Sequence, residues 1–441
     1  MRKHLRYIAV AVSAAAAIGL AGCSTGPSSP DSGNALSLPV KDPSATITVM
    51  SIDSLGDPNH DDKVVAAFEK AHPSIKVKWQ TIPFNSLTSV EDTNISNKQG
   101  TPDVYWADQP RISALAARGE AEDLTSVFSK YKSSFDASPY ESGIYNGKLW
   151  ALPIENSTQL LYYNKDLLKR AGITDPSPDV DRRMTWEELG DLALKAKQAG
   201  AVNGLSFGQA NTYYQLEPLP VSLGGSVGAN GKGNLTPDID SAAWIKAFQW
   251  YGKVYASGAA AKGQTYSTTD PDFLAGKTAF EVQGPWLLPQ LPSSGVNWGV
   301  APMPKFAGGK AVTPDGSWSL AINPFSKQKA ASAIFLKWMA IDEGSGYIKY
   351  SPVTSLAASP TGKKIYFQND VFATPEGRNA EAIIEHETAK TAVNRVGTVG
   401  YIEFETIVGK AFSDIQNGAD VESTLKQASA DLTVAWAKYK S

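Results

Sequence analysis

The sequence predicts an α/β protein with two lobes, in which helices cover the faces of a parallel β-sheet. The first observation is the order of segments before residue 120, where strand-like and helix-like patterns alternate as in βαβ units. The second is length: about 400 of the 441 residues follow the N-terminal leader, which favours two cores over one.

The first 22 residues have the pattern of a signal peptide. A basic start, Met1 to Arg6, precedes an apolar, Ala-rich run over 7–21 that is too short to span a bilayer comfortably. The run ends in Leu-Ala-Gly-Cys at 20–23, which resembles a bacterial lipobox and predicts lipidation of Cys23. The alternative is an ordinary signal peptide with an incidental cysteine. Cys23 is the only cysteine, so no intramolecular disulfide can form.

Residues 23–42 are rich in Ser, Pro, Gly and Asp, and we expect a flexible tether between the lipid anchor and a folded body. No later stretch reaches about 18 apolar residues, so no further membrane span is predicted. Together these segments predict an extracytoplasmic protein held at the cell membrane by Cys23.

The composition disfavours nucleic acid as a partner. Loss of the leader's Arg2, Lys3 and Arg6 leaves 38 basic and 44 acidic residues, a formal charge of −6, and no basic run stands out. The chain has 11 Trp and 17 Tyr, whose flat faces can stack on the apolar faces of sugar rings. We expect most of these rings to lie in the core.

The elements follow in order along the first third. Residues 45–50 form a β-rich run, 61–71 a helix with acids at its start, and 75–79 an alternating strand. Residues 102–108 predict another strand and 112–119 a helix.

Ligands of such sheets bind at the carboxyl ends of strands. This places Asp53, Trp106 and Asp108 at a candidate cleft.

The middle and the end of the chain are more helical. Thr185 and Glu188 form a capping box that predicts a helix start. A stripe of rings over 244–255 has helical spacing, and we assign it to the core. Another amphipathic helix is predicted over 330–338.

Catalytic and cofactor motifs are missing from the sequence. The Gly-rich run 225–233 lacks the P-loop spacing, no Gly-x-Ser-x-Gly occurs, and the four histidines lack metal-ligand spacing. We expect no cofactor and no metal site. Asp108 and Glu155 remain a possible carboxylate pair for a glycosidase.

Several segments resemble the extracellular solute-binding proteins of ABC importers, within the sugar-binding family that includes maltose-binding protein. The resemblance spans nearly the whole mature chain in order and spacing. It is carried by 145–153 (YNGKLWALP), 161–167 (LYYNKDL), 273–280 (FLAGKTAF), 284–286 (GPW), 298–304 (WGVAPMP), 316–322 (GSWSLAI) and 329–338 (KAASAIFLKW).

The resemblance implies a periplasmic-binding-protein-like class II fold, with two discontinuous α/β lobes and a ligand cleft between them. It implies crossing segments near Pro153–Gln159, Ala301–Pro304 and Tyr350–Ser355. Lobe one would comprise 43–154 plus 302–350, and lobe two 155–301 plus 351–441. The partners it implies are a small carbohydrate and the permease subunits of an ABC transporter, and we expect a monomer.

Ligand contacts can be carried over by position. Trp106 matches a ring that contacts sugar in the maltose binder, Trp286 matches its stacking Trp, and Tyr214 lies near another ring contact. The C-terminal helix departs from the pattern, because Phe404 or Glu405 stands where the maltose binder has a Trp. Maltose itself is therefore not assumed.

The remaining candidates have an open alternative as packing, capping or salt-bridge residues. If the stretch around Tyr213 and Tyr214 is extended, only one ring faces the cleft, and Tyr214 is preferred. The candidates are Trp318, Asp53, Glu155, Asn156 and Arg395, with Asp108 as a hydrogen-bonding side chain or a helix cap.

The function predicted is capture of a carbohydrate, a di- or oligosaccharide, for an importer. The alternatives are a binder of another small polar solute, such as a glycerophosphodiester, and a surface glycosidase.

Overall fold

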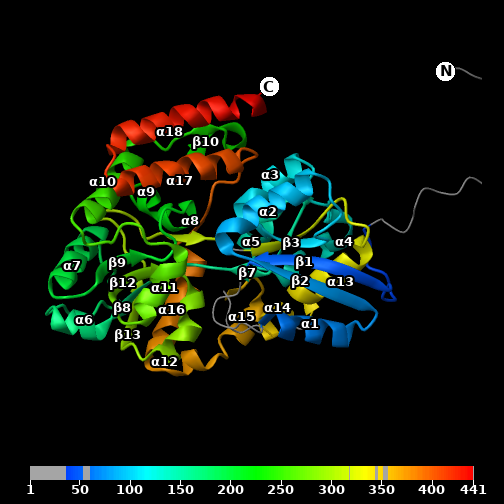
Figure 1. The fold of residues 1–441 in the computed structure, drawn as a ribbon, viewed down its shortest axis with the longest axis horizontal. Helices are drawn as coiled ribbons and strands as arrows, with labels where there is room; N and C mark the ends of the chain where they lie inside the picture. Colours follow the sequence, from blue (N-terminus) through cyan, green and yellow to red (C-terminus); the bar gives the residue numbers. More distant parts are fainter. Residues whose placement is uncertain (1–35, 53–59, 317, 343–345, 351–355, 441) are drawn as a thin grey trace, which may run out of the picture.

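A computed structural model describes residues 36–52, 60–316, 318–342, 346–350 and 356–440. Two lobes lie side by side, with β1–β3 in the right-hand lobe of Figure 1 and β8, β9, β12 and β13 in the left-hand one. Cys23, Asp53, the signal peptide and most of the tether lie outside the described residues.

The first lobe contains a five-stranded sheet in the order β2-β1-β3-β15-β6. β1 is parallel to β2 and to β3, whereas β15 is antiparallel to β3 and β6. The predicted N-terminal strands are confirmed, and the sheet is mixed, not purely parallel. The strands are β1 (Ala45–Ile52), β2 (Ile75–Ile82), β3 (Val104–Asp108), β6 (Leu152–Pro153) and β15 (Trp318–Ile322).

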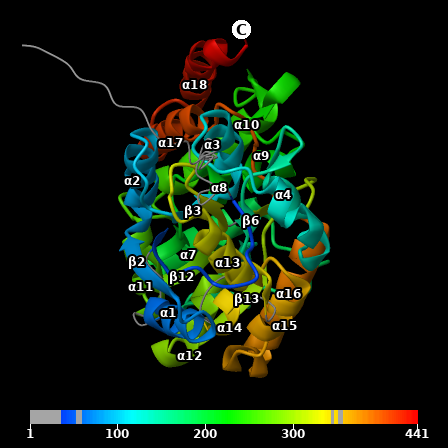
Figure 2. The ribbon, with the colours of Figure 1, turned by 90° about the vertical axis from the view of Figure 1, so that its right-hand side faces the viewer.

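Helices cover this sheet as the βαβ pattern predicts. α1 and α13 both pack against α14 on the side that faces the viewer in Figure 2. The helices of this lobe are α1 (His60–Ala71), α2 (Phe84–Ser96), α3 (Ile112–Ala117), α4 (Thr125–Phe128), α5 (Ala137–Ser142), α13 (Lys329–Ala340) and α14 (Gly346–Tyr350).

The second lobe contains a four-stranded sheet in the order β13-β8-β12-β9. β12 is parallel to β9, and β8 is antiparallel to both of its neighbours. The strands are β8 (Leu160–Asn164), β9 (Asn203–Phe207), β12 (Thr278–Gln283) and β13 (Trp298–Pro302).

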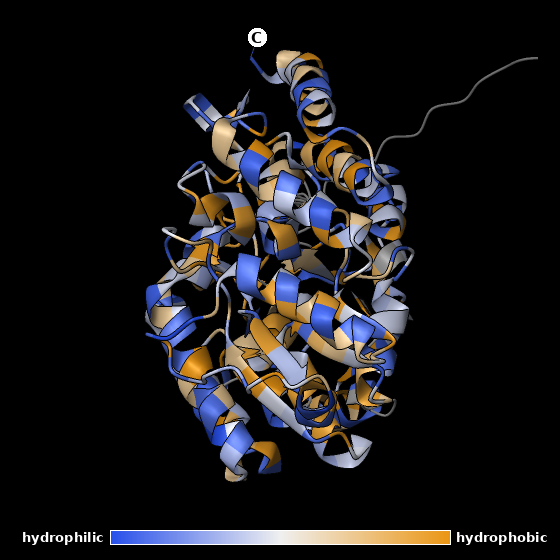
Figure 3. Cartoon of the chain, turned by 90° about the vertical axis from the view of Figure 1, so that its left-hand side faces the viewer, coloured by the Kyte–Doolittle hydropathy of each residue, from blue (hydrophilic) through white to orange (hydrophobic). Residues whose placement is uncertain are grey.

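Helices of the second lobe come from the middle and the end of the chain. In Figure 3 their outer surfaces are largely hydrophilic, and the strands behind them are mainly hydrophobic. They are α6 (Lys165–Arg170), α7 (Trp186–Gln198), α8 (Tyr213–Leu216), α9 (Pro218–Ser222), α10 (Ala242–Ala256), α11 (Tyr266–Leu274), α12 (Leu291–Ser294), α15 (Pro360–Tyr366), α16 (Pro375–Lys390), α17 (Tyr401–Asn417) and α18 (Val421–Trp436).

Local predictions in these helices are confirmed. Thr185 caps α7 through a reciprocal capping box with Glu188. The rings of the α10 stripe are buried: Trp244, Phe248, Tyr251 and Tyr255.

Short strand pairs join the lobes. β7 (Glu155–Asn156) pairs with β16 (Leu356–Ala357), and β14 (Thr313–Asp315) pairs with β17 (Ala392–Asn394). The chain therefore passes from the first sheet to the second between β6 and β8, and returns through β14 to β15.

The return comes later than the predicted crossing at Ala301–Pro304. β13 pairs with β8 along its whole length, and Met303 and Phe306 belong to the second lobe's core. The predicted division of the chain at residue 302 stays a prediction, and these contacts favour a boundary close to β14.

Two hydrophobic cores support the arrangement. One contains the first sheet and continues to α15, α16 and one face of the second sheet, while the other fills the opposite face of the second sheet. Within the described residues, none of the helices combines the length and hydrophobicity that crossing a bilayer requires.

Candidate functional site

An ion pair between the lobes occupies the centre of the site. Asp108 ends β3 in the first lobe, and Arg395 follows β17 on the loop that leads to α17. Arg395 donates from both terminal nitrogens to the two oxygens of Asp108, with Nη1 2.7 Å from Oδ2. The side chains are only 6% and 17% exposed, respectively. The alternative role of Asp108 as a helix cap is not observed, because its side chain caps no N–H group.

Burial is the largest single influence and lowers the pKa of Arg395, but the charge and hydrogen bonds of Asp108, together with Tyr401 and Tyr214, outweigh burial and raise that pKa. The guanidinium therefore stays charged, and its charge is matched by a carboxylate from the opposite lobe.

Tyr214 lies directly against this pair. The guanidinium of Arg395 lies 5.0 Å from the centre of the Tyr214 ring, within the range of a cation–π contact. The Tyr214 hydroxyl is 2.8 Å from Ser157 Oγ, on the crossing segment after β7. Tyr213 and Tyr214 are not extended, because they are the first two residues of the short helix α8. Successive side chains of a helix point in different directions, so the two rings do too.

Trp286 extends the ring surface. Its ring centre lies 6.4 Å from that of Tyr214, at an interplanar angle of 34°. Gly284 permits this placement, because a Cβ there would lie only 2.1 Å from the Trp286 ring. The indole N–H of Trp286 has no hydrogen-bond partner in the described part of the chain.

Further rings meet across the lobes. Trp318 is half-buried and opposes Asp108 in the register of β15 and β3. Phe84, at the start of α2, packs 6.3 Å from Trp318 and 5.1 Å from Tyr266 of the second lobe. Five predicted residues thus form one connected set: Trp318, Asp108, Arg395, Tyr214 and Trp286.

Trp106 lies elsewhere. It is 1% exposed in the first core, with Trp79 and Tyr347 packed edge-on at 5.4 and 5.6 Å. This environment favours a packing role, and the carried-over ligand contact remains a prediction.

Glu155 and Asn156 lie on the crossing strand β7, where both are buried. Asn156 accepts a hydrogen bond from the Ser157 backbone N–H and contacts Asp315 of β14. These positions link the crossing segments to one another.

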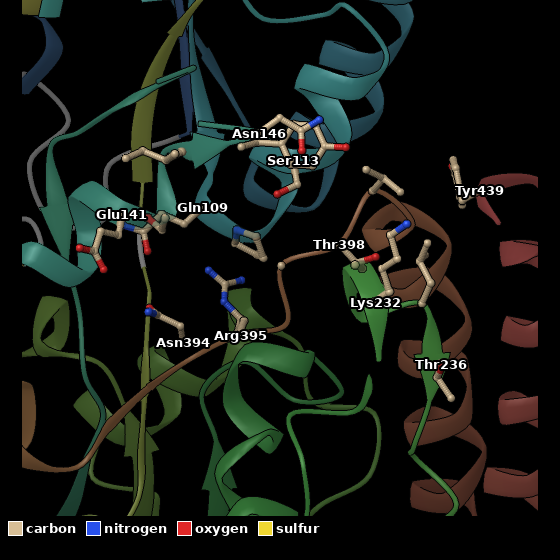
Figure 4. Close-up of a pocket in the computed structure, with 18 of the residues that line it drawn as sticks. Gln109, Ser113, Glu141, Asn146, Lys232, Thr236, Asn394, Arg395, Thr398 and Tyr439 are labelled. Carbon is tan, nitrogen blue, oxygen red and sulfur yellow. The ribbon is translucent and has the colours of Figure 1, made fainter. Parts of the chain in front are cut away.

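A cavity of about 1190 Å³ lies between the lobes beside Arg395. In Figure 4 Arg395 occupies its middle, with Asn394 and Glu141 to one side and Thr398, Lys232 and Tyr439 to the other. Its lining comes from the first lobe (109–113 and 141–146), from β14 and from second-lobe segments (232–236, 394–399 and 439–440).

Three buried polar groups on the cavity wall are incompletely satisfied. Gln109 Nε2, Asp315 Oδ1 and Arg395 Nε have no partner among the residues that the structure describes. Burial raises the pKa of Asp315, although hydrogen bonds from Ser138 and Asn156 oppose this. Within the described chain the cavity wall therefore holds two unpaired donors and one unpaired acceptor, each covered by neighbouring atoms, and a ligand hydroxyl would reach them after a small movement of those neighbours.

Acidic groups dominate the surroundings of Arg395. Glu217 is fully buried beside it, and burial raises the pKa of Glu217 well above its ordinary value. A second ion pair crosses the lobes nearby, from Arg111 Nη1 to Glu405 Oε2 at 3.2 Å. Phe404, the other candidate for the ring position, is buried in the second core.

The described residues contain no cluster of three or more His, Cys, Asp or Glu side chains placed to hold a metal ion. Sequence reasoning missed Gln109, Ser157, Asp315 and the Phe84–Tyr266 contact. Ser157 directly follows Asn156, and Asp315 lies three residues before Trp318, so closeness in sequence to a predicted residue could have indicated both. Phe84 and Tyr266 are 182 residues apart and carry no local signal.

Comparison with known proteins places this geometry in context. The sequence matches the bacterial extracellular solute-binding protein family over residues 57–345. It is 26% identical over 291 residues to the galactooligosaccharide-binding protein of Bacillus subtilis (strain 168), a match covering 64% of this chain and 66% of that protein.

A second relative is named for a phosphate ester instead of a sugar. The sn-glycerol-3-phosphate-binding periplasmic protein UgpB of Brucella abortus (strain 2308) is 26% identical over 276 residues, 58% of this chain and 62% of that protein. Each match therefore spans just under two thirds of the relative.

A solved structure shares the fold. The ABC substrate-binding protein Lmo0181 of Listeria monocytogenes, in complex with cycloalternan, superposes with a TM-score of 0.77 at 22% identity. The alignment covers 89% of this chain and 99% of that one. The two-lobed class II architecture is confirmed.

Proposed function

The chain belongs to the bacterial extracellular solute-binding protein family, and we propose that it is the carbohydrate receptor of an ABC importer. In this proposal the protein captures a di- or oligosaccharide between its lobes and delivers it to the permease. The name of the galactooligosaccharide-binding relative and the cycloalternan complex of the similar structure support a sugar ligand.

The observation that carries the proposal is the set of rings and polar groups around Arg395. Trp286 and Tyr214 form a pair of rings next to Arg395, outside the cavity lining itself, and Gln109 and Asp315 hold polar atoms on the cavity wall that are unpaired among the described residues. Sugar rings need both, because they present apolar faces and hydroxyl edges. The cavity exceeds the usual range for drug-sized ligands, about 300–1,000 Å³, which favours an oligosaccharide.

A titration screen tests the proposal. Isothermal titration calorimetry with mono-, di- and trisaccharides should give saturable binding to at least one oligosaccharide. Trp286→Ala should weaken that binding. Binding of a peptide or a polyamine with no response to any sugar would contradict the carbohydrate assignment.

The second candidate ligand is a glycerophosphodiester or a related phosphate, since one relative is named for sn-glycerol 3-phosphate. The same screen should include sn-glycerol 3-phosphate and glycerophosphocholine. We propose that the protein is a binding protein and not an enzyme. Turnover of a chromogenic glycoside would contradict this proposal.

We also propose that the protein is extracytoplasmic, monomeric and anchored to the membrane through lipidated Cys23. The lipobox-like sequence before Cys23 and the extracellular family support this location. Growth with radiolabelled palmitate should label the wild-type protein in the membrane fraction, and Cys23→Ala should abolish both the label and the retention.

A further inference from the structure

Arg395 is the cation placed deepest along the cavity wall. Its side chain is 6% exposed, whereas the lysines on the same lining, Lys232 and Lys440, are exposed. A buried guanidinium is the group that best recognises phosphate, because its planar fork matches two oxygens. The question is whether a ligand anion can reach that fork.

The terminal nitrogens of the Arg395 guanidinium are already occupied by Asp108. Both terminal nitrogens of Arg395 donate to Asp108, and only Nε remains without a partner in the described chain. A ligand phosphate would have to displace a carboxylate that is fixed at the end of β3. It would also leave that carboxylate buried without its counter-charge, which is strongly unfavourable.

Further acidic groups also lie near Arg395. Glu217, Asp315 and Glu405 interact electrostatically with Arg395, although burial raises the pKa of each and so reduces its negative charge. Glu141 adds an exposed acid to the lining, opposite the exposed lysines at the rim. Neutral hydroxyl groups pay no such cost, because they hydrogen-bond to Nε or to Asp315 without a net charge.

We propose that Asp108 is a specificity-determining residue, which masks Arg395 so that the cleft accepts neutral hydroxyl-rich ligands and rejects phosphate esters. This rests on the proposed function and deepens it. The preference for neutral sugars over phosphate esters then has two sources. One is the Asp108 carboxylate, which occupies the position that a ligand anion would need, and the other is direct contact with the sugar.

The test is a gain of anion binding. Wild-type protein, Asp108→Asn and Asp108→Ser are titrated with inorganic phosphate and with sn-glycerol 3-phosphate by calorimetry at low ionic strength. Freed charged hydrogen bonds should lower the dissociation constant for the anions by about tenfold or more in both variants. Two variants are used because either could fold poorly, and circular dichroism selects the folded one.

Two controls locate the effect. Adding Arg395→Gln to Asp108→Asn should abolish the gained anion binding. Glu405→Gln removes a different ion pair across the lobes, the one with Arg111, while leaving Asp108 on Arg395, so it should gain no anion binding. A gain in this control would show that any loosened lobe contact suffices and would overturn the proposal.

The outcomes separate this proposal from the proposed function. Phosphate binding by the wild type, or no gain in a folded Asp108 variant, overturns the masking role of Asp108. Sugar titrations of the wild type alone decide whether the protein is a carbohydrate receptor.

Discussion

Trp286 and Trp106 have contrasting surroundings, although the family resemblance predicts a ligand contact for both. Trp286 is half-buried with a free indole N–H among the described residues, whereas Trp106 lies within the first core between Trp79 and Tyr347. Trp286 was predicted from the Gly-Pro-Trp match and Trp106 from its position near the end of a strand, and the strand pattern could not determine that Trp106 faces the core.

We expect Trp286→Ala to weaken oligosaccharide binding by tenfold or more, a typical cost of removing an aromatic anchor. Trp106→Phe should leave that affinity within about threefold but lower the free energy of unfolding by about 1–3 kcal/mol. Calorimetric titration and urea unfolding measure the two effects. The reverse pattern would assign Trp106 to the ligand and Trp286 to packing.

Gly316 lies against the guanidinium of Arg395, which is paired with Asp108. A Cβ at this position would lie 2.8 Å from Arg395 Nη2, which is too close without movement. Gly316→Ala should therefore displace Arg395 and destabilise the protein by about 1–3 kcal/mol. Gly397→Ala is the matched control, since a Cβ there meets nothing within 4 Å. Thermal unfolding of both variants checks this, and equal stability would contradict it.

At the scale of elements, periodicity predicted local structure well and connections poorly. β1, α1, β2 and α7 follow alternation, helical spacing and a capping box, all of which are properties of neighbouring residues. The pairings β7 with β16 and β14 with β17 join segments that are far apart in the chain. Nothing local specifies them, so the predicted position of the second crossing rested on the family resemblance and not on neighbouring residues.

An acid pair links α11 to β12. Asp270 and Glu281 interact directly, and Asp272 and Tyr162 add negative or ionisable neighbours. Burial raises the pKa of Asp270 to about 6, against a hydrogen bond from Gln283 that lowers it. Burial raises the pKa of Glu281 well above its ordinary value.

Both pKa values are higher in the folded state than in the unfolded state. The stabilising contribution of protonation is therefore fully present below pH about 4 and is lost as the pH rises through 6 and beyond. Glu281→Gln removes one ionisable group while keeping its shape. We expect this variant to be more stable than the wild type near pH 8 by about 1 kcal/mol or more, with a flatter decline from pH 5 to 8.

Thermal unfolding across that pH range measures the difference. Glu69→Gln is the control, because the hydrogen bond from Lys76 lowers the pKa of Glu69 and confines its contribution to the acid side. A parallel decline for wild type and Glu281→Gln would contradict the role of the pair.

At the scale of the molecule, contacts hold the two lobes together. Two ion pairs, Asp108–Arg395 and Arg111–Glu405, and the Phe84–Tyr266 ring contact all join the lobes. A receptor that binds ligand between its lobes gains affinity from any contact that favours the binding-competent arrangement. The family resemblance predicted the two lobes and the cleft, but not these contacts, which depend on tertiary placement.

Removing contacts away from Arg395 should shift the lobes toward an open arrangement. We expect Phe84→Ala combined with Glu405→Gln to increase the ligand-free radius of gyration in small-angle X-ray scattering. The apparent sugar affinity should fall in proportion to the lost competent fraction, because apparent affinity scales with that population. At saturating sugar the radius of gyration should return to the wild-type value, since ligand binding supplies the missing free energy. An unchanged radius together with weaker binding would instead show that Phe84 or Glu405 touches the sugar directly.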